Sequence, residues 1–105
     1  MISKTPEPPY YAVIFTSLRT DGDEGYAAMS EKMLQLASRA KGFLGAEWAR
    51  NELGITVSYW ESLEAIKCWK NDVQHTVARK LGKEKWYKAF RVRVAKVERE
   101  YGFDG

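Results

Sequence analysis

The segment from Tyr10 to Arg19 constrains the fold more than any other part of this 105-residue chain. Its apolar residues fall at both alternating positions: Tyr10, Ala12, Ile14 and Leu18 on one side, and Tyr11, Val13 and Phe15 on the other. A strand with one face in water alternates apolar with polar residues, and this segment does not. We therefore predict a strand whose two faces are both buried.

Two amphipathic helices are predicted next to this strand. The residues at helical spacing are Tyr26, Met29, Met33, Leu36 and Ala40 in the first helix, and Ile66, Trp69, Val73 and Val77 in the second. Asp21 or Asp23 is expected to cap the first helix, and Ser62 the second. Gly42 predicts the end of the first helix, and Leu81–Gly82 the end of the second.

Three further strands complete the predicted domain. They span Phe43 to Arg50, Ile55 to Trp60 and Ala89 to Arg99, and a hairpin loop over Asn51 to Gly54 joins the first two. The order β-α-β-β-α-β predicts an α+β, ferredoxin-like fold with an antiparallel four-stranded sheet. The first and third strands are then central, and both helices lie on one face.

Two helices cover only one face of such a sheet, so the apolar strand predicts a partner for the other face. Soluble proteins avoid exposing a large apolar surface. A homodimer that packs sheet against sheet is the expected solution, and a hetero-complex is the alternative. We expect residues 1–9 to be a flexible lead-in, residues 10–99 to form the domain, and residues 100–105 to be a tail.

Composition limits the location and the partners of the chain. The single cysteine, Cys68, excludes an internal disulfide, and no Cys/His cluster suggests a metal site. No signal peptide or membrane-length apolar run is recognisable, so we expect a cytoplasmic protein without a membrane partner. Basic residues crowd residues 79–99, which indicates either a solvated face with a charged edge strand or a site for an anion.

No motif in the sequence indicates a particular reaction. A phosphate-binding glycine loop, HExxH, GxSxG and metal-ligand spacings are all absent. The only histidine, His75, lies roughly 180° around the second helix from Ile66, which favours solvent over catalysis. The third strand, Gly54 to Trp60, lacks the basic-Gly-aromatic pattern of RNA-binding domains of this topology, so we expect no nucleic-acid partner.

Aromatic side chains are the remaining candidates for a ligand-binding site. Trp69 lies on the buried stripe of the second helix, where it either packs the core or lines a cleft between helix and sheet. Trp86 and Tyr87 follow that helix and are placed to close one end of such a cleft. The sequence alone does not decide whether these rings pack in the core or line a pocket.

Several motifs together resemble the antibiotic biosynthesis monooxygenase (ABM) domain family. They are Tyr11 to Ser17, Gly42 to Gly45, Ser58 to Ile66 followed by Trp69 and His75, and Trp86–Tyr87 with Arg91 to Ala95. The similarity covers about residues 10–99, and the last of these motifs resembles an uncharacterised bacterial branch of the family. It implies a dimeric α+β barrel with the ligand between the helices and the sheet.

The resemblance implies cofactor-independent oxygenation of a small aromatic or quinol. Such chemistry needs aromatic walls, a base and a cation that faces the developing oxyanion. We predict His75 as the base and Arg91, or else Arg79, as the cation. The predicted walls of the pocket are Tyr59, Trp69, Trp86 and Tyr87.

Haem-degrading relatives combine an Asn on the first strand, a Trp on the second helix and a His ten residues further on. Trp69 matches the Trp, but Arg79 stands in place of the His, and Thr16 or Ser17 in place of the Asn. We therefore expect no resident cofactor and no haem degradation. Two alternatives to the enzyme remain: a non-catalytic protein that binds haem or a hydrophobic anion, and a protein whose dimer surface is itself functional.

Overall fold

A computed structural model describes residues 2–22, 25–75 and 86–105, and its element order confirms the predicted one. The elements are β1 (Tyr10–Arg19), α1 (Tyr26–Arg39), β2 (Phe43–Arg50), β3 (Leu53–Trp60), α2 (Leu63–His75) and β4 (Tyr87–Val97). None of the helices in these ranges is long and apolar enough to cross a membrane.

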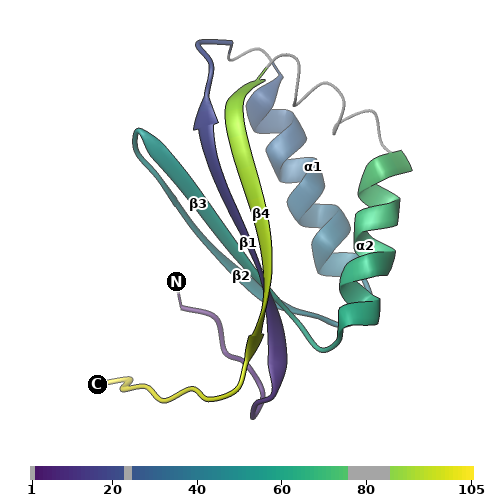
Figure 1. Cartoon of the computed structure of the whole chain (residues 1–105), viewed down its shortest axis with the longest axis vertical. Coiled ribbons are helices and arrows are strands. Elements are labelled where there is room, and N and C mark those ends of the chain that lie inside the picture. The colour runs from purple at the N-terminus through teal and green to yellow at the C-terminus, as the bar shows by residue number, and fades with distance from the viewer. Residues whose placement is uncertain (1, 23–24, 76–85) are drawn as a thin grey trace.

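One antiparallel sheet forms the backbone of the fold, in the order β2-β3-β1-β4. The two most apolar strands, β1 and β3, are central, as predicted. Both helices lie on the same side of the sheet (Figure 1). We call this side the inner face and the opposite side the outer face.

The core lies between the inner face and the helices. It is built from Val13 and Trp60 of the sheet and from Ala37, Ala65 and Ile66 of the helices. Trp60 is fully buried, and its ring packs 5.4 Å from that of Phe43 and 5.1 Å from that of Trp69. Its Nε1–H donates a hydrogen bond of 2.9 Å to Ser58 Oγ. Of the predicted periodic residues, Ile66 lies in this core and Ala40 and Trp69 pack against it, whereas Ala37 and Ala65 were not among the residues predicted.

Helix caps agree with the prediction at one helix and differ at the other. Ser62 Oγ accepts a hydrogen bond of 3.0 Å from the Ala65 N–H, which confirms Ser62 as the cap of α2. The cap of α1 is Gly25, at a φ of 79°, without a side-chain hydrogen bond, so Asp21 was the wrong choice. Asp23, Val77 and the predicted helix end at Leu81–Gly82 lie outside the described residues.

Two strand boundaries also differ from the prediction. The turn after β2 is shorter than expected, because Leu53 and Gly54 already pair with Leu18 and Ser17 of β1. The last strand runs two residues earlier than expected, over Tyr87–Val97, because Val97 pairs with Tyr10 at the start of β1. In both cases the pairing partner, and not the local sequence, sets the limit of the strand.

The outer face carries apolar residues that no helix covers. Alternation along the paired strands assigns to it Tyr10, Ala12, Ile14, Thr16 and Leu18 of β1, Leu53, Ile55, Val57 and Tyr59 of β3, Gly45, Glu47 and Ala49 of β2, and Ala89, Arg91, Arg93, Ala95 and Val97 of β4. Within one chain Tyr10 and Ala12 are buried, whereas Leu18, Leu53 and Ile55 are 43%, 46% and 42% exposed. The outer face is thus an incompletely buried apolar layer.

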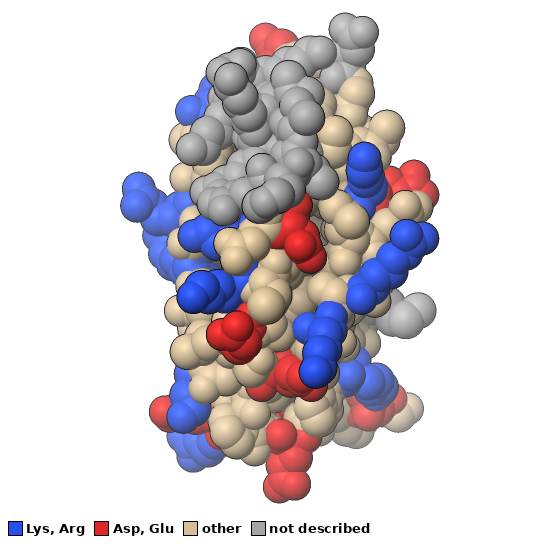
Figure 2. Space-filling model, turned by 90° about the vertical axis from the view of Figure 1, so that its right-hand side faces the viewer, with Lys and Arg blue, Asp and Glu red and all other residues tan. Residues whose placement is uncertain are grey.

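The two ends of the chain meet beside the sheet. Ser3 N–H donates to Glu47 Oε2 at 2.9 Å, and Thr5 Oγ1–H donates to Glu100 Oε1 at 2.7 Å. Tyr101 and Phe103 in the tail remain almost fully exposed. On the helix side of the molecule, acidic and basic side chains are intermixed over the coloured surface (Figure 2). That described surface therefore lacks the uniform positive field typical of a nucleic-acid interface.

Candidate functional site

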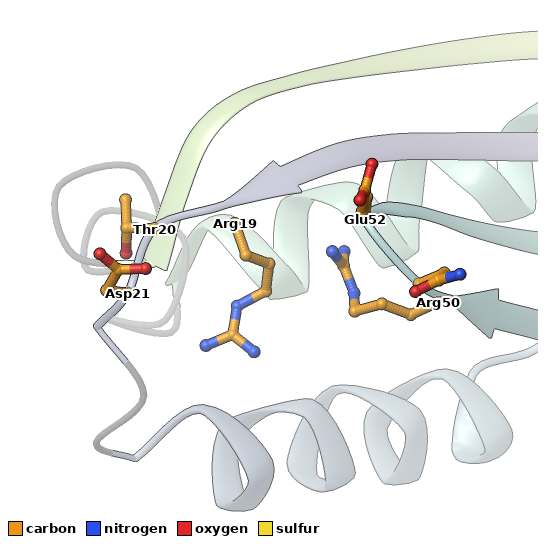
Figure 3. A pocket seen from close by; sticks show the side chains of 6 residues that line it. Arg19, Thr20, Asp21, Arg50 and Glu52 are labelled. Atoms are coloured by element: carbon orange, nitrogen blue, oxygen red, sulfur yellow. The ribbon is translucent and has the colours of Figure 1, made fainter.

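An open depression of about 400 Å³ lies where β1 ends and the β2–β3 hairpin turns. Its lining residues are Arg19, Thr20, Asp21, Arg50, Asn51 and Glu52. Arg19 and Arg50 come from different strands, and their guanidinium groups project into the space between the sheet and α1 (Figure 3). The depression therefore presents two cations to one volume.

Stacking and hydrogen bonding hold Arg19 in place. Its guanidinium carbon lies 3.4 Å from the centroid of the Tyr26 ring, at the start of α1. Its Nη2–H donates a hydrogen bond of 2.9 Å to the Gly22 carbonyl. A guanidinium on the face of a tyrosine ring is a favourable cation–π contact. Arg19 thus joins the depression to the rings beneath it.

Arg50 reaches the same space by crossing the neighbouring strand. Its guanidinium donates a hydrogen bond to Ser17 Oγ on β1, and the Ser17 side chain is buried. Gly54 of β3 lies between these two residues in the sheet register. A Cβ at Gly54 would overlap the Arg50 guanidinium. The absence of a side chain at Gly54 therefore makes the crossing possible.

An aromatic cluster underlies the two arginines. Its members are Phe15, Tyr26, Trp86, Tyr87 and Phe90. Phe15 lies 5.4 Å from Tyr87 and 5.5 Å from Phe90, and Tyr26 lies 5.8 Å from Trp86, in each case edge to face. Such pairs are the preferred geometry for aromatic rings. The cluster forms an apolar wall between β1, β4 and the start of α1.

The hydroxyl of Tyr87 is the polar group of this cluster. Burial raises the pKa of Tyr87, and its hydrogen bond with Tyr26 raises it further, while the nearby charges of Arg50 and Arg19 lower it by less. The net shift of the pKa is upward. Tyr87 therefore keeps its proton at neutral pH and serves as a hydrogen-bond donor and not as a base.

A second depression, of about 530 Å³, lies between the end of α1 and α2. It is lined by Arg39, Ala40, Lys41, Glu61, Ser62, Glu64, Ala65, Cys68, Trp69 and Asp72. Trp69 packs on Trp60, and its Nε1–H is buried without a hydrogen-bond partner. Its rim carries three carboxylates against two cations, whereas the first depression carries two of each, so the second depression is the weaker candidate for an anionic ligand.

The residues predicted for the site do not all meet in one cleft. Trp86 and Tyr87 join the aromatic cluster, and Trp69 lines the second depression. Tyr59 lies on the outer face, where its hydroxyl donates to Glu47 Oε1 at 2.6 Å. Arg91 pairs with Thr16 and lies on the outer face too. The side chain of His75 and the whole of Arg79 lie outside the described part of the chain.

The sequence analysis did not single out Arg19 and Arg50, the two arginines of the first depression. Arg19 ends an apolar strand and Arg50 ends the strand before the hairpin, and each fits equally well as a solvated strand end. A glycine at the start of the next strand, Gly54, was the one available signal. Its meaning depends on strand register, which the sequence does not display.

Haem does not fit the residues that line either depression. The first lining set contains no histidine, methionine, tyrosine or cysteine, and the second offers only the Cys68 thiol, whose neighbour is the Glu64 carboxylate at 3.8 Å and not a cation that would favour the thiolate. The described residues also hold no group of three or more His, Cys, Asp or Glu side chains placed to bind a metal ion. We derive no chemical step through haem.

Solved structures identify the fold. The chain superimposes on Rv0793 from Mycobacterium tuberculosis with a TM-score of 0.75 and 14% identity, over 89% of this chain and 99% of that one. SnoaB, a cofactor-independent oxygenase from Streptomyces nogalater, gives 0.73 and 6%, over 87% and 95%. A Bordetella bronchiseptica protein provisionally assigned as an antibiotic biosynthesis monooxygenase gives 0.65 and 20%, over 84% and 96%. The chain therefore has the ferredoxin-like fold of the ABM-domain proteins, as the sequence motifs indicated.

Sequence similarity identifies a family within that fold. The chain belongs to the same family as the uncharacterized protein YqjZ of Bacillus subtilis (strain 168). The two are 50% identical over 101 residues, which span 94% of this chain and 89% of YqjZ. No family model matches the sequence.

Proposed function

We propose that the protein is a cofactor-independent monooxygenase of a small phenol or quinol, acting at the depression between Arg19 and Arg50. The observation that carries this proposal is the meeting of two guanidinium groups in one depression, with Arg19 seated on the Tyr26 ring of the aromatic cluster. Among the described residues, no aromatic ring lines the depression itself, so its two planar guanidinium groups are the surfaces on which a flat ring would stack, and a fixed cation favours the phenolate of that ring. SnoaB, which shares the fold, is a cofactor-independent oxygenase, and this supports the same reaction class here.

The reaction balances without a cofactor. A phenolate transfers an electron pair, in single-electron steps, from its ring to O₂, and a C–O bond forms at the ring carbon. The peroxide anion takes up the proton that the phenol gave to the base and becomes a hydroperoxide. The hydrogen on the same carbon then leaves as a proton while the O–O bond breaks, and the departing hydroxide takes up that proton to form water. The substrate is oxidised to a quinone, one atom of O₂ is retained, and the other is reduced to water.

Each step assigns a role to a residue of this chain. Arg19 is our choice for the cation, since it lies on the Tyr26 ring and lowers the energy of the phenolate. Tyr87 stays protonated and is hydrogen-bonded to Tyr26, so it helps to position the ring on which Arg19 lies. His75 remains the proposed base on sequence grounds alone. Arg91 has no part in this proposal, because it lies on the outer face.

Oxygen uptake tests the proposal. The purified protein is supplied with hydroquinone, anthrone and substituted phenols, and an oxygen electrode follows turnover. Arg19→Gln is expected to lower kcat/KM by about 100-fold, as the loss of one oxyanion-stabilising donor does in other enzymes. Arg99→Gln, an exposed arginine near the C-terminus, is the matched control and is expected to keep full activity. If these compounds bind but no oxygen is consumed, the oxygenase proposal is wrong, and the protein is a non-catalytic binding protein.

We propose further that the protein is a homodimer that packs outer face against outer face. Leu18, Leu53 and Ile55 are each more than two-fifths exposed on that face, and a second copy would remove them from water. Sedimentation velocity at micromolar concentration is expected to give a dimer. Ile55→Glu is expected to give a monomer, and Leu63→Glu, exposed on α2, is the control that stays dimeric. A wild-type monomer would refute this assembly.

A further inference from the structure

We propose that the natural substrate is an ortho-hydroxylated aromatic carboxylate, whose carboxylate binds Arg50 while its phenolate oxygen faces Arg19. This inference rests on the proposed function and narrows its substrate class. A simple phenol needs one cation, and the depression offers two from separate strands (Figure 3). A ligand with two adjacent anionic oxygens uses both.

Arg50 lacks a carboxylate partner of its own. Within the described ranges, the one ion pair joins Lys4 to Asp104, at 3.0 Å. Glu52 lines the same depression, but its carboxylate points away from the Arg50 guanidinium (Figure 3). A guanidinium group has five N–H donors, and the hydrogen bond of Arg50 to the neutral Ser17 uses only one side of the group. The charge of Arg50 is therefore available to a ligand.

The position of Arg50 is preorganised. The guanidinium crosses the bare backbone at Gly54 and is anchored on Ser17, which is only 4% exposed. An arginine held in this way loses less conformational entropy when it binds a ligand than a freely mobile one. An arginine that only kept the surface soluble would need neither a hydrogen bond to the buried Ser17 hydroxyl nor a glycine at position 54 to make room for its guanidinium.

The chemistry of the group selects a carboxylate. The planar fork of a guanidinium matches the two oxygens of a carboxylate in a bidentate pair. The depression, of about 400 Å³, is large enough for a single substituted ring, since ligand sites of roughly 300–1,000 Å³ are usual. Asp21 and Glu52 at the rim repel ligands with more extended negative charge, such as polyphosphates.

A matched pair of compounds tests the inference. Hydroquinone and 2,5-dihydroxybenzoate share one ring and differ only by the ortho carboxylate. Anaerobic titration calorimetry measures the Kd of each for the full-length protein without turnover. We expect 2,5-dihydroxybenzoate to bind about tenfold to a hundredfold more tightly, as a charge-assisted hydrogen-bonded pair implies.

Two variants remove the preference by different routes. Arg50→Gln deletes the charge, and Gly54→Ala inserts a methyl group where the guanidinium lies. Both are expected to bring the two Kd values to within about threefold of each other. Arg99→Gln and Gly102→Ala are the matched controls, and a Cβ at Gly102 meets no atom within 4 Å. Both controls are expected to keep the preference.

The outcomes separate this inference from the proposed function. Equal affinity of the wild-type protein for both compounds, or a preference that survives in Arg50→Gln, overturns the carboxylate assignment. In either case oxygen uptake with neutral quinols still decides the oxygenase proposal. If neither compound binds at millimolar concentration, the carboxylate assignment is overturned, and the oxygenase proposal is decided by uptake with the wider panel.

Discussion

The hydrogen bond between Trp60 and Ser58 allows a quantitative test of the core. Trp60 has no exposed surface, and its Nε1–H donates to Ser58 Oγ at 2.9 Å. Ser58→Ala leaves this buried donor without an acceptor, which costs about 1–3 kcal/mol of unfolding free energy. Trp60→Phe removes the donor together with part of the ring, and the smaller volume costs about 1–2 kcal/mol.

The double variant separates the hydrogen bond from the packing. In the Trp60→Phe background there is no indole donor to satisfy, so Ser58→Ala is expected to cost little more. The two substitutions should therefore be non-additive, with a coupling free energy of about 1 kcal/mol. Such losses are large against the 5–15 kcal/mol total that is usual for a folded domain.

Urea denaturation followed by far-UV circular dichroism measures these free energies. The protein concentration is held constant across the variants, because self-association would shift each midpoint. The slope of the unfolding free energy against urea is expected to stay unchanged. Additive losses, or a Ser58→Ala variant as stable as the wild type, would show that the indole N–H finds another acceptor and would refute the reasoning.

Two further predictions follow from the backbone and from the outer face. Gly42 has a φ of 90°, and a Cβ there would lie 2.6 Å from Ala65 Cβ and 2.9 Å from Glu61 Cγ, so Gly42→Ala is expected to lower the thermal midpoint by several degrees in calorimetry. Burial and the adjacent Glu47 carboxylate raise the pKa of Tyr59 from 10.0 to about 12, so its contribution to stability is complete below pH 10 and is lost as the pH rises through about 12. Glu47→Gln is expected to move this pKa part of the way back to 10, and an ultraviolet phenolate titration in which the pKa of Tyr59 did not move would contradict the assignment.

The fold was predictable because its signals are local. The signals are apolar residues at both alternating positions in β1, the period of 3.6 in α1 and α2, and the Ser62 cap, and each one depends only on neighbouring residues. Where the predicted strand boundaries were wrong, pairing with a residue distant in the sequence set the boundary. Leu53 joined β3 because it meets Leu18 across the sheet, although its neighbours resemble a loop.

The candidate site was only partly predictable. Trp86 and Tyr87 were singled out, since rings that follow a helix are placed to close a cleft, and they do join the aromatic cluster. In the sequence, nothing distinguishes Arg91 from the other basic residues of its segment as a candidate for the site. Strand parity relative to Thr16 put it on the outer face, and no local pattern fixes that parity.

The sequence by itself determined the six elements, their order and the need to cover a second apolar face, because periodicity and connectivity rules act along the chain. Only the tertiary structure decided that Arg50 passes over Gly54 to Ser17 and meets Arg19 above Tyr26. That meeting depends on the register of three strands, and the pairing of β1 with β3 joins residues more than thirty positions apart.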